Sequence, residues 1–172
     1  ITTCVHDLRE PSLTSLQRRL ISSISCKKAS KKTNKNLEIQ IKKGLFSEDR
    51  VSVDPFFSEA QSNDRYLGWI EDELTRGATV YDVDLKEKNV GFFLARESKG
   101  QTLFALLGGI YPDFQKAGLG LAMNYLEIDL ARKLGLKKVK TSYSSNNRGA
   151  SSIHHQLAYN IENQYYVLVK HY

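Results

Sequence analysis

The sequence is poor in the residues that mark secreted, membrane-spanning or metal-binding proteins. Its 172 residues include two cysteines, three prolines, one methionine and one tryptophan. Two cysteines, Cys4 and Cys26, are too few for a disulfide framework or a paired-thiol zinc site. No apolar run approaches the roughly 18 residues that cross a bilayer, and the N-terminus lacks the basic-then-apolar layout of a signal peptide. These absences predict a soluble, cytoplasmic protein with no metal and no membrane contact.

Positive charge is abundant but confined to one part of the chain. The net charge is +6, and residues 27–43 hold seven lysines against a single acid, Glu38. Such a polar run is typical of a solvated loop. It could also steer an anionic partner, nucleic acid included. No aromatic residue is interleaved with these lysines, so nucleic-acid binding is the least favoured alternative.

Hydrophobic periodicity predicts a single α/β (α+β) domain, a mixed sheet flanked by helices. Residues 1–43 are expected to form an N-terminal helix followed by the basic loop. The predicted helices are 12–25, 65–76, 118–134 and 147–157. The predicted strands are 79–84, 89–96, 102–110, 137–143, 158–161 and 164–171.

The most informative stretch, GIYPDFQKAGLGLA, joins a predicted strand to the long helix at 118–134. The first amides of a helix are unpaired and can receive phosphate oxygens. Glycines at 118 and 120 let the backbone approach such an anion closely. A P-loop ending and the third glycine of a dinucleotide fingerprint are both missing. Without further signals, these two glycines would indicate only a tight turn.

The segment QKAGLG resembles the coenzyme A pyrophosphate loop of the GNAT superfamily of N-acyltransferases. This resemblance implies a mostly antiparallel sheet, acetyl-CoA as co-substrate and an acyltransferase activity. The backbone amides of 116–121 would hold the pyrophosphate, and the preceding strand would line the pantetheine arm. The cofactor-binding residues that it implies are Gly109, Ile110, Gln115, Lys116, Ala117, Gly118, Leu119, Gly120, Leu121 and Asn147.

A second match to the superfamily follows the next predicted strand. Asn147 and Ala150 fit its Asn-x-x-Ala pattern, but His154 stands where the family usually has a tyrosine. By this resemblance, His154 would be the general acid that protonates the coenzyme A thiolate after direct attack by an amine. Tyrosines 125, 143 and 159 are the alternative acids. Asn147 could instead be a simple helix cap.

The acceptor amine is suggested by a mixed polar and aromatic cluster, Arg50, Asp54, Tyr66 and Trp69. Its layout resembles the amino-terminal portion of acetyltransferases that modify amino sugars on nucleotide carriers, the TDP-fucosamine acetyltransferase type. Tyr66 and Trp69 could equally be core residues of a helix. The alternative functions are acetylation of a protein or polyamine amine, and a non-catalytic module that binds coenzyme A or a partner. The resemblance also allows a homodimer.

Overall fold

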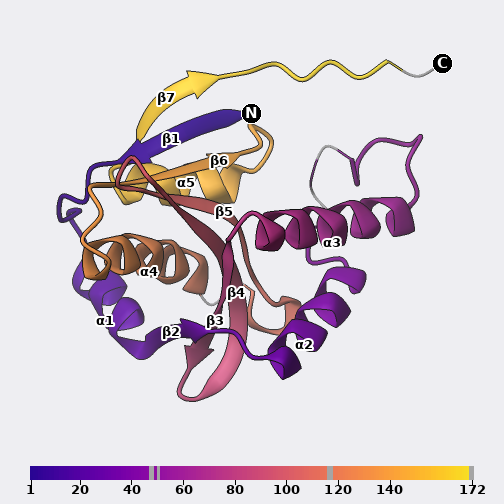
Figure 1. The fold of residues 1–172 in the computed structure, drawn as a ribbon. Helices are drawn as coiled ribbons and strands as arrows, with labels where there is room; N and C mark the ends of the chain where they lie inside the picture. Colours follow the sequence, from indigo (N-terminus) through magenta and orange to yellow (C-terminus); the bar gives the residue numbers. More distant parts are fainter. Residues whose placement is uncertain (47–48, 50, 116–117, 171–172) are drawn as a thin grey trace.

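The computed structural model describes residues 1–46, 49, 51–115 and 118–170, with the backbone alone at 31–34 (Figure 1). The helices are α1 (Ser15–Ser23), α2 (Lys31–Lys42), α3 (Glu59–Thr75), α4 (Leu119–Lys133) and α5 (Arg148–Gln156). The strands are β1 (Thr2–His6), β2 (Ile24–Lys28), β3 (Thr79–Leu85), β4 (Lys88–Ser98), β5 (Thr102–Ile110), β6 (Lys138–Tyr143) and β7 (Asn160–Gln164).

The strands form one sheet in the order β2-β3-β4-β5-β6-β1-β7. Every neighbouring pair is antiparallel except β5 and β6, which run parallel because α4 crosses between them. The predicted mixed, mostly antiparallel sheet flanked by helices is therefore confirmed.

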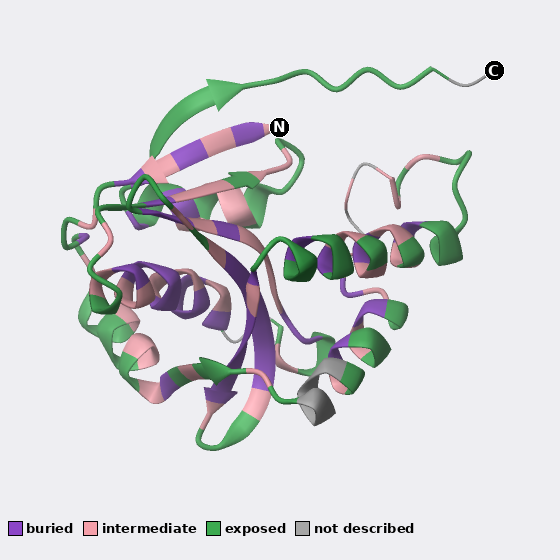
Figure 2. Cartoon of the chain, in the orientation of Figure 1, coloured by how far each residue is buried: buried purple, intermediate pink, exposed green. Residues whose placement is uncertain are grey.

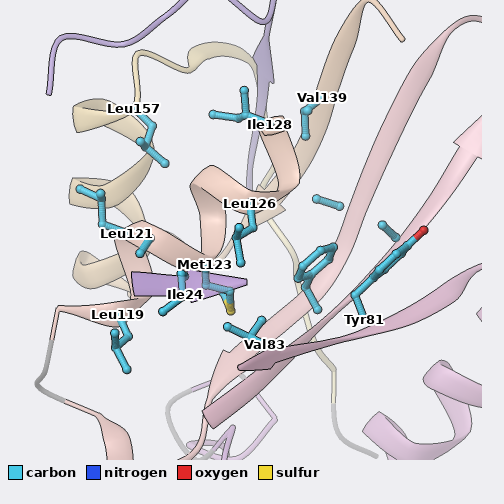
Figure 3. Close-up of a cluster of buried hydrophobic side chains, with 14 of the residues drawn as sticks. Ile24, Tyr81, Val83, Leu119, Leu121, Met123, Leu126, Ile128, Val139 and Leu157 are labelled. Carbon is cyan, nitrogen blue, oxygen red and sulfur yellow. The ribbon is translucent and has the colours of Figure 1, made fainter. Parts of the chain in front are cut away.

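Buried residues follow the strands in the middle of the sheet (Figure 2), and an apolar cluster lies on each of its faces. On one face, α1, α4 and α5 pack on the strands through a cluster that includes Met123, Leu126 and Leu157 (Figure 3). On the other face, α2 and α3 contribute Ile41 and Ile70 to a second cluster. Strands β3, β4 and β5 lie between these two layers of helices, so the middle of the sheet is buried on both faces.

Two segments differ from their predicted structure. The basic stretch is not a loop, because residues 24–28 form β2 and residues 31–42 form α2. Burial explains the helix, since Leu37 and Ile41 lie in the second cluster. Lys35 and Lys42 are exposed. The last predicted strand, 164–171, is not found in the described residues: β7 ends at Gln164, Tyr165 exchanges backbone hydrogen bonds of 2.7 and 2.8 Å with Ile1, and residues 166–170 are exposed without strand structure (Figure 1).

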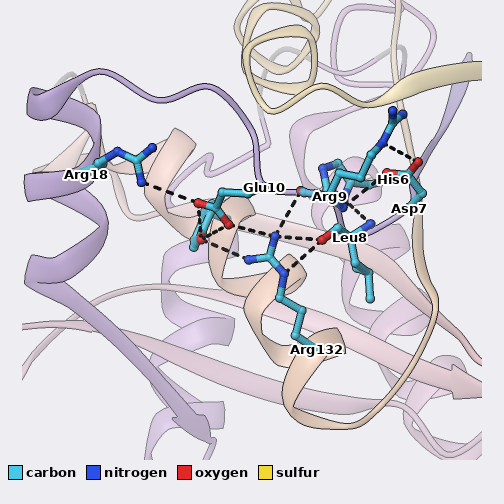
Figure 4. Close-up of polar contacts among 8 residues, drawn as sticks. His6, Asp7, Leu8, Arg9, Glu10, Arg18 and Arg132 are labelled. Atoms are coloured by element: carbon cyan, nitrogen blue, oxygen red, sulfur yellow. Dashed lines mark hydrogen bonds and ion pairs between the residues drawn. The ribbon is translucent and has the colours of Figure 1, made fainter.

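The N-terminal strand β1, which was not predicted, lies between β6 and β7. Its connection to α1 is fastened to α4 by Arg132, whose guanidinium donates to the carbonyl oxygens of Leu8 and Arg9 (Figure 4). Arg132 also pairs with Glu10 at 3.0 Å, and Glu10 lies 3.7 Å from Arg18 on α1. These contacts place α1 alongside α4. Among the helices of the described segments, none is both long and apolar enough to span a membrane.

Candidate functional site

The central feature of the site is a separation of β5 from β6. Their parallel pairing runs from Thr102 and Lys138 to Ala105 and Thr141, while β5 continues to Ile110. An extra residue in β5 starts the divergence: Leu94 of β4 faces Leu107, but the next residue of β4 faces Ala105. This bulge bends β5 away from β6. The edge of β5 beyond it is left without a strand partner.

Glycines let other groups approach this end of β5 closely. A Cβ at Gly109 would lie 3.3 Å from Leu45, which follows α2, and a Cβ at Gly108 would lie 3.1 Å from Met123 of α4. The predicted pantetheine residues Gly109 and Ile110 are thus at the separated strand end. The side chain of Ile110 is buried in the first cluster, so only its backbone can serve a ligand.

The turn after β5 delivers the chain to α4 without capping the helix. Gln115 is held by a bond from its Nε2 to the carbonyl oxygen of Ile110, 3.2 Å away. Gly118 is the N-cap residue, in the left-handed conformation with φ of 73°, and it provides no side-chain cap. The first amides of α4 therefore remain available to an anion. The predicted residues Lys116 and Ala117 lie outside the described residues.

A cavity of about 280 Å³ opens beside this helix start. Of the predicted residues, Gly118, Gly120 and Leu121 line it, whereas Leu119 points into the core. The remaining lining comes from α1 and α5: Gln17, Leu20, Ile153 and Gln156. Sequence reasoning missed this wall, because the periodicity of α1 predicts a helix but not the partner beside which it lies.

Asn147 forms the N-cap of α5. Its Oδ1 accepts a hydrogen bond of 2.9 Å from the backbone N–H of Ala150, which stabilises the helix start. Its side-chain amide N–H groups face outward, since the residue is exposed. The structure thus gives Asn147 the capping role that the sequence offered as an alternative, and leaves its amide free for a ligand.

His154, the predicted acid, lies in the interior with 5% of its surface exposed. Its Nδ1 is 2.7 Å from the carbonyl oxygen of Ala150, and its ring stacks on Tyr143 with centroids 5.0 Å apart. Burial lowers the pKa of this imidazole. A neutral ring that donates Nδ1–H to a carbonyl has an unprotonated Nε2.

The three tyrosines that are alternative acids differ in burial and in their hydrogen-bond partners. Tyr159 is buried against His154, with centroids 4.8 Å apart, and burial raises its pKa. Tyr125 is committed elsewhere: its hydroxyl bonds to both carboxylate oxygens of Glu10 at 3.1 Å. Tyr143 is half-buried and lies on β6 beyond the last residue paired with β5. Its hydroxyl lies 3.5 Å from Ser151 Oγ of α5.

Two of the predicted acceptor residues, Tyr66 and Trp69, lie in or against the second cluster. Tyr66 is buried, stacked on Phe46 at 4.3 Å, and burial together with Asp49 raises its pKa. Trp69 packs partly on the second cluster, and Asp54 accepts a bond from a backbone N–H two residues on. The predicted residue Arg50 lies outside the described residues.

A second, smaller cavity lies on the same side of the sheet as α2 and α3. It measures about 220 Å³ and is lined by Gly44, Ser52, Glu59 and Asn63. Leu45, the neighbour of Gly44, lies 3.3 Å from a Cβ built on Gly109 of β5. None of these lining residues was singled out by the sequence. In the ranges that the structure covers, no cluster of His, Cys, Asp or Glu could hold a metal ion.

No protein-family model and no curated protein sequence matches the chain. Solved structures do resemble it. YycN from Bacillus subtilis superposes with a TM-score of 0.66 at 17% identity, covering 87% of this chain and 98% of that one. Spermidine N-acetyltransferase from Vibrio cholerae, in complex with CoA and spermine, gives 0.61 at 14% identity over 83% of each chain. PaiA N-acetyltransferase from Thermoplasma acidophilum, in complex with coenzyme A, gives 0.60 at 12%, covering 83% and 92%. The chain therefore has the GNAT acetyltransferase fold.

Proposed function

We propose that the protein transfers an acetyl or other short acyl group from acyl-CoA to a primary amine. The observation that carries this proposal is the open gap between β5 and β6 next to the uncapped start of α4. A pantetheine arm in the gap can pair with the free backbone of β5. The pyrophosphate then reaches the first amides of α4 across the Gly118 turn.

The reaction needs no covalent enzyme intermediate. The neutral amine attacks the thioester carbonyl, a backbone N–H of β5 near Gly109 stabilises the oxyanion, and the C–S bond breaks. An acid donates a proton to the departing thiolate. The attacking amine loses one proton, so no net proton is gained or lost in the reaction. The residues of the chain thus supply position, an oxyanion donor and a proton.

The sequence offers a histidine and several tyrosines as the acid, and their surroundings in the structure distinguish them. His154 keeps its proton on Nδ1 toward Ala150, and burial disfavours its charged form. Tyr143 carries a phenolic O–H group and lies on β6 beyond the last residue paired with β5. These facts favour Tyr143 as the donor, with the ring of His154 behind it.

We propose an amino sugar on a nucleotide carrier as the acceptor. The net charge of +6 favours an anionic nucleotide over a polyamine cation, which it repels at long range. The cavity at Ser52, Glu59 and Asn63 offers a hydroxyl, a carboxylate and an amide, groups that hydrogen-bond sugar hydroxyls. The spermine bound in the Vibrio cholerae structure makes polyamines the comparison substrate for an acceptor screen.

Calorimetric titration with CoA tests the cofactor part of the proposal. We expect saturable binding by the native chain and a loss of affinity of about 100-fold or more in Gly118→Asp. The new carboxylate would repel the pyrophosphate where the helix start attracts it. Gly135→Asp is the matched control, since Gly135 also has positive φ (68°) but lies at the other end of α4.

Three outcomes would count against the proposal. If CoA does not bind the native chain at millimolar concentration, the fold has lost its co-substrate, and a non-catalytic interaction module becomes the better description. If both aspartate variants lose affinity equally, the effect reflects backbone strain rather than the anion site. Binding without acetylation of any amine in the screen would leave a CoA-binding module.

A further inference from the structure

We propose that Asp49 is a positioning residue for the acceptor amine: with Arg65 it holds Ser52 in the wall of the smaller cavity, where the Ser52 hydroxyl accepts a hydrogen bond from the acceptor. This inference rests on the proposed function and names the residue that shapes its acceptor site. The cavity is lined by Gly44, Ser52, Glu59 and Asn63. Asp49 does not line the cavity and acts from behind its wall.

The carboxylate of Asp49 ties the start of this wall to α3. One oxygen, Oδ2, pairs with the guanidinium of Arg65 on α3. The other, Oδ1, accepts hydrogen bonds from the backbone N–H groups of Val51 and Ser52 at 2.6 and 2.8 Å. Both oxygens are therefore engaged, and the backbone at Ser52 is fixed relative to the helix that supplies the other polar groups of the lining.

Aromatic packing keeps this ion pair in place. The Arg65 guanidinium lies 4.3 Å from the ring centroid of Tyr66, and that ring stacks on Phe46 with centroids 4.3 Å apart. The side chain of Asp49 is 15% exposed, so solvent screens its charge only in part. Burial would raise the pKa of Asp49, but the hydrogen bonds that it accepts and the charge of Arg65 lower this pKa overall. The carboxyl group is therefore ionised at neutral pH.

Two further hydrogen bonds orient the hydroxyl of Ser52. Its Oγ–H donates to the carbonyl oxygen of Phe46 at 2.9 Å, and its oxygen lies 2.6 Å from Oγ of Ser62 on α3. Because the single proton of Ser52 is used toward Phe46, Ser62 is the donor in the second contact. Ser52 thus keeps one lone pair for a ligand and has no donor to offer. The carboxylate of Glu59 is also an acceptor. This part of the lining favours ligands that present several O–H and N–H groups, as an amino sugar does.

The test is steady-state kinetics on Asp49→Asn with TDP-fucosamine as the acceptor. The variant keeps the size of the side chain, but its amide NH₂ must face either Arg65 or the backbone N–H groups at 51–52, donor against donor. One of the two attachments is lost, so we expect KM for the acceptor to rise about tenfold, while kcat and the Kd for CoA stay within about twofold. Arg65→Gln breaks the same pair from the helix and should raise KM in the same way.

A double-mutant cycle asks whether Asp49 acts through Ser52. Ser52→Ala removes the hydroxyl and should itself raise KM about tenfold. In the double variant, KM should be no more than about twofold above that of Ser52→Ala, because the group that Asp49 positions is already gone. Glu38→Gln is the matched control: it removes a carboxylate from an exposed ion pair with Lys42 on α2, and it should leave KM unchanged.

The outcomes separate this inference from the proposed function. Unchanged KM in Asp49→Asn and Arg65→Gln, an equal loss of CoA affinity, or a rise of roughly 100-fold in the double variant would overturn the positioning role while acyl transfer stands. A native chain that acetylates other amines but not TDP-fucosamine would overturn both the amino-sugar acceptor and this inference. Failure of the native chain to bind CoA would overturn the proposed function as a whole.

Discussion

Glu127 of α4 is an ionisable side chain enclosed by the first cluster, and the titration of its carboxyl group should dominate the pH dependence of stability. Burial raises its pKa from 4.5 to about 8. Tyr159 lies close to Glu127 and Cys4, whose charges add to the effect of burial in raising the pKa of Tyr159. Burial also raises the pKa of Cys4. Since the folded state holds the proton more tightly than the unfolded chain, the stability from protonated Glu127 is lost as pH rises from about 4.5 to 8.

Replacing Glu127 with glutamine keeps the shape and removes this ionisation. We expect Glu127→Gln to stabilise the protein by ~3 kcal/mol more at pH 8 than at pH 5, because the native carboxylate must be protonated or buried charged at the higher pH. Denaturant melts at the two pH values measure the difference. His6 and His154, whose pKa values burial lowers, are present in both proteins and cancel. An equal gain at both pH values would contradict the shifted pKa.

The stacked pair of His154 and Tyr143 permits a test of which one gives the proton. Tyr143→Phe removes the hydroxyl and keeps the ring, and it should lower kcat by roughly 10²–10⁴-fold with little change in CoA affinity. His154→Phe removes the ring nitrogens and keeps the stacking surface, so kcat should fall by less than about tenfold. Steady-state kinetics on the best acceptor decides. The reverse ranking would return the acid to the histidine.

At the scale of elements, local signals were enough for the centre of the fold. The leucine spacing of α4, its glycines at both ends and the apolar runs of β3, β4 and β5 all agree with the structure. The pyrophosphate loop was identifiable because its chemistry lies in consecutive residues. In contrast, β1 is short and polar in part, and only its long-range pairing with β6 makes it a strand. No local pattern could have assigned it.

The cavity shows the same limit. Its floor comes from the glycine turn, which the sequence indicated, but its walls come from two helices that are distant in the chain. The acceptor residues were predicted from their nearness in sequence, which could not indicate the burial of Tyr66: its ring stacks on Phe46 and contacts the guanidinium of Arg65. Sequence proximity was a poor guide wherever a helix turned successive residues to different faces.

Helix α1 should be sensitive to its N-cap residue. Thr14 and Gln17 form a capping box, and the same glutamine reaches α5. Thr14→Ala should destabilise the protein by about 1 kcal/mol through the lost cap, as measured by thermal melts. Ser58→Ala, which removes the corresponding cap of α3, should cost similar stability.

For the whole molecule, the net charge of +6 should act on the rate of encounter with an anionic co-substrate. Raising the salt concentration shortens the screening length from about 30 Å at 0.01 M to about 8 Å at 0.15 M. We therefore expect the association rate constant for CoA, measured by stopped flow, to fall by roughly threefold or more over this range while dissociation changes less. A rate that is independent of salt would mean that the lysines of α2 face away from the path of the ligand.

The position of β1 also has a consequence for how the protein is made. This strand is synthesised before both of its hydrogen-bonding neighbours, β6 and β7, which are the last two strands of the described sheet. Until then, its alternating buried residues, Thr2, Cys4 and His6, have no sheet to join. The nascent chain must therefore carry β1 unpaired while residues 7–137 are synthesised, a state open to aggregation and to capture by chaperones. Completion of the sheet becomes a late event that requires β1, β6 and β7 together.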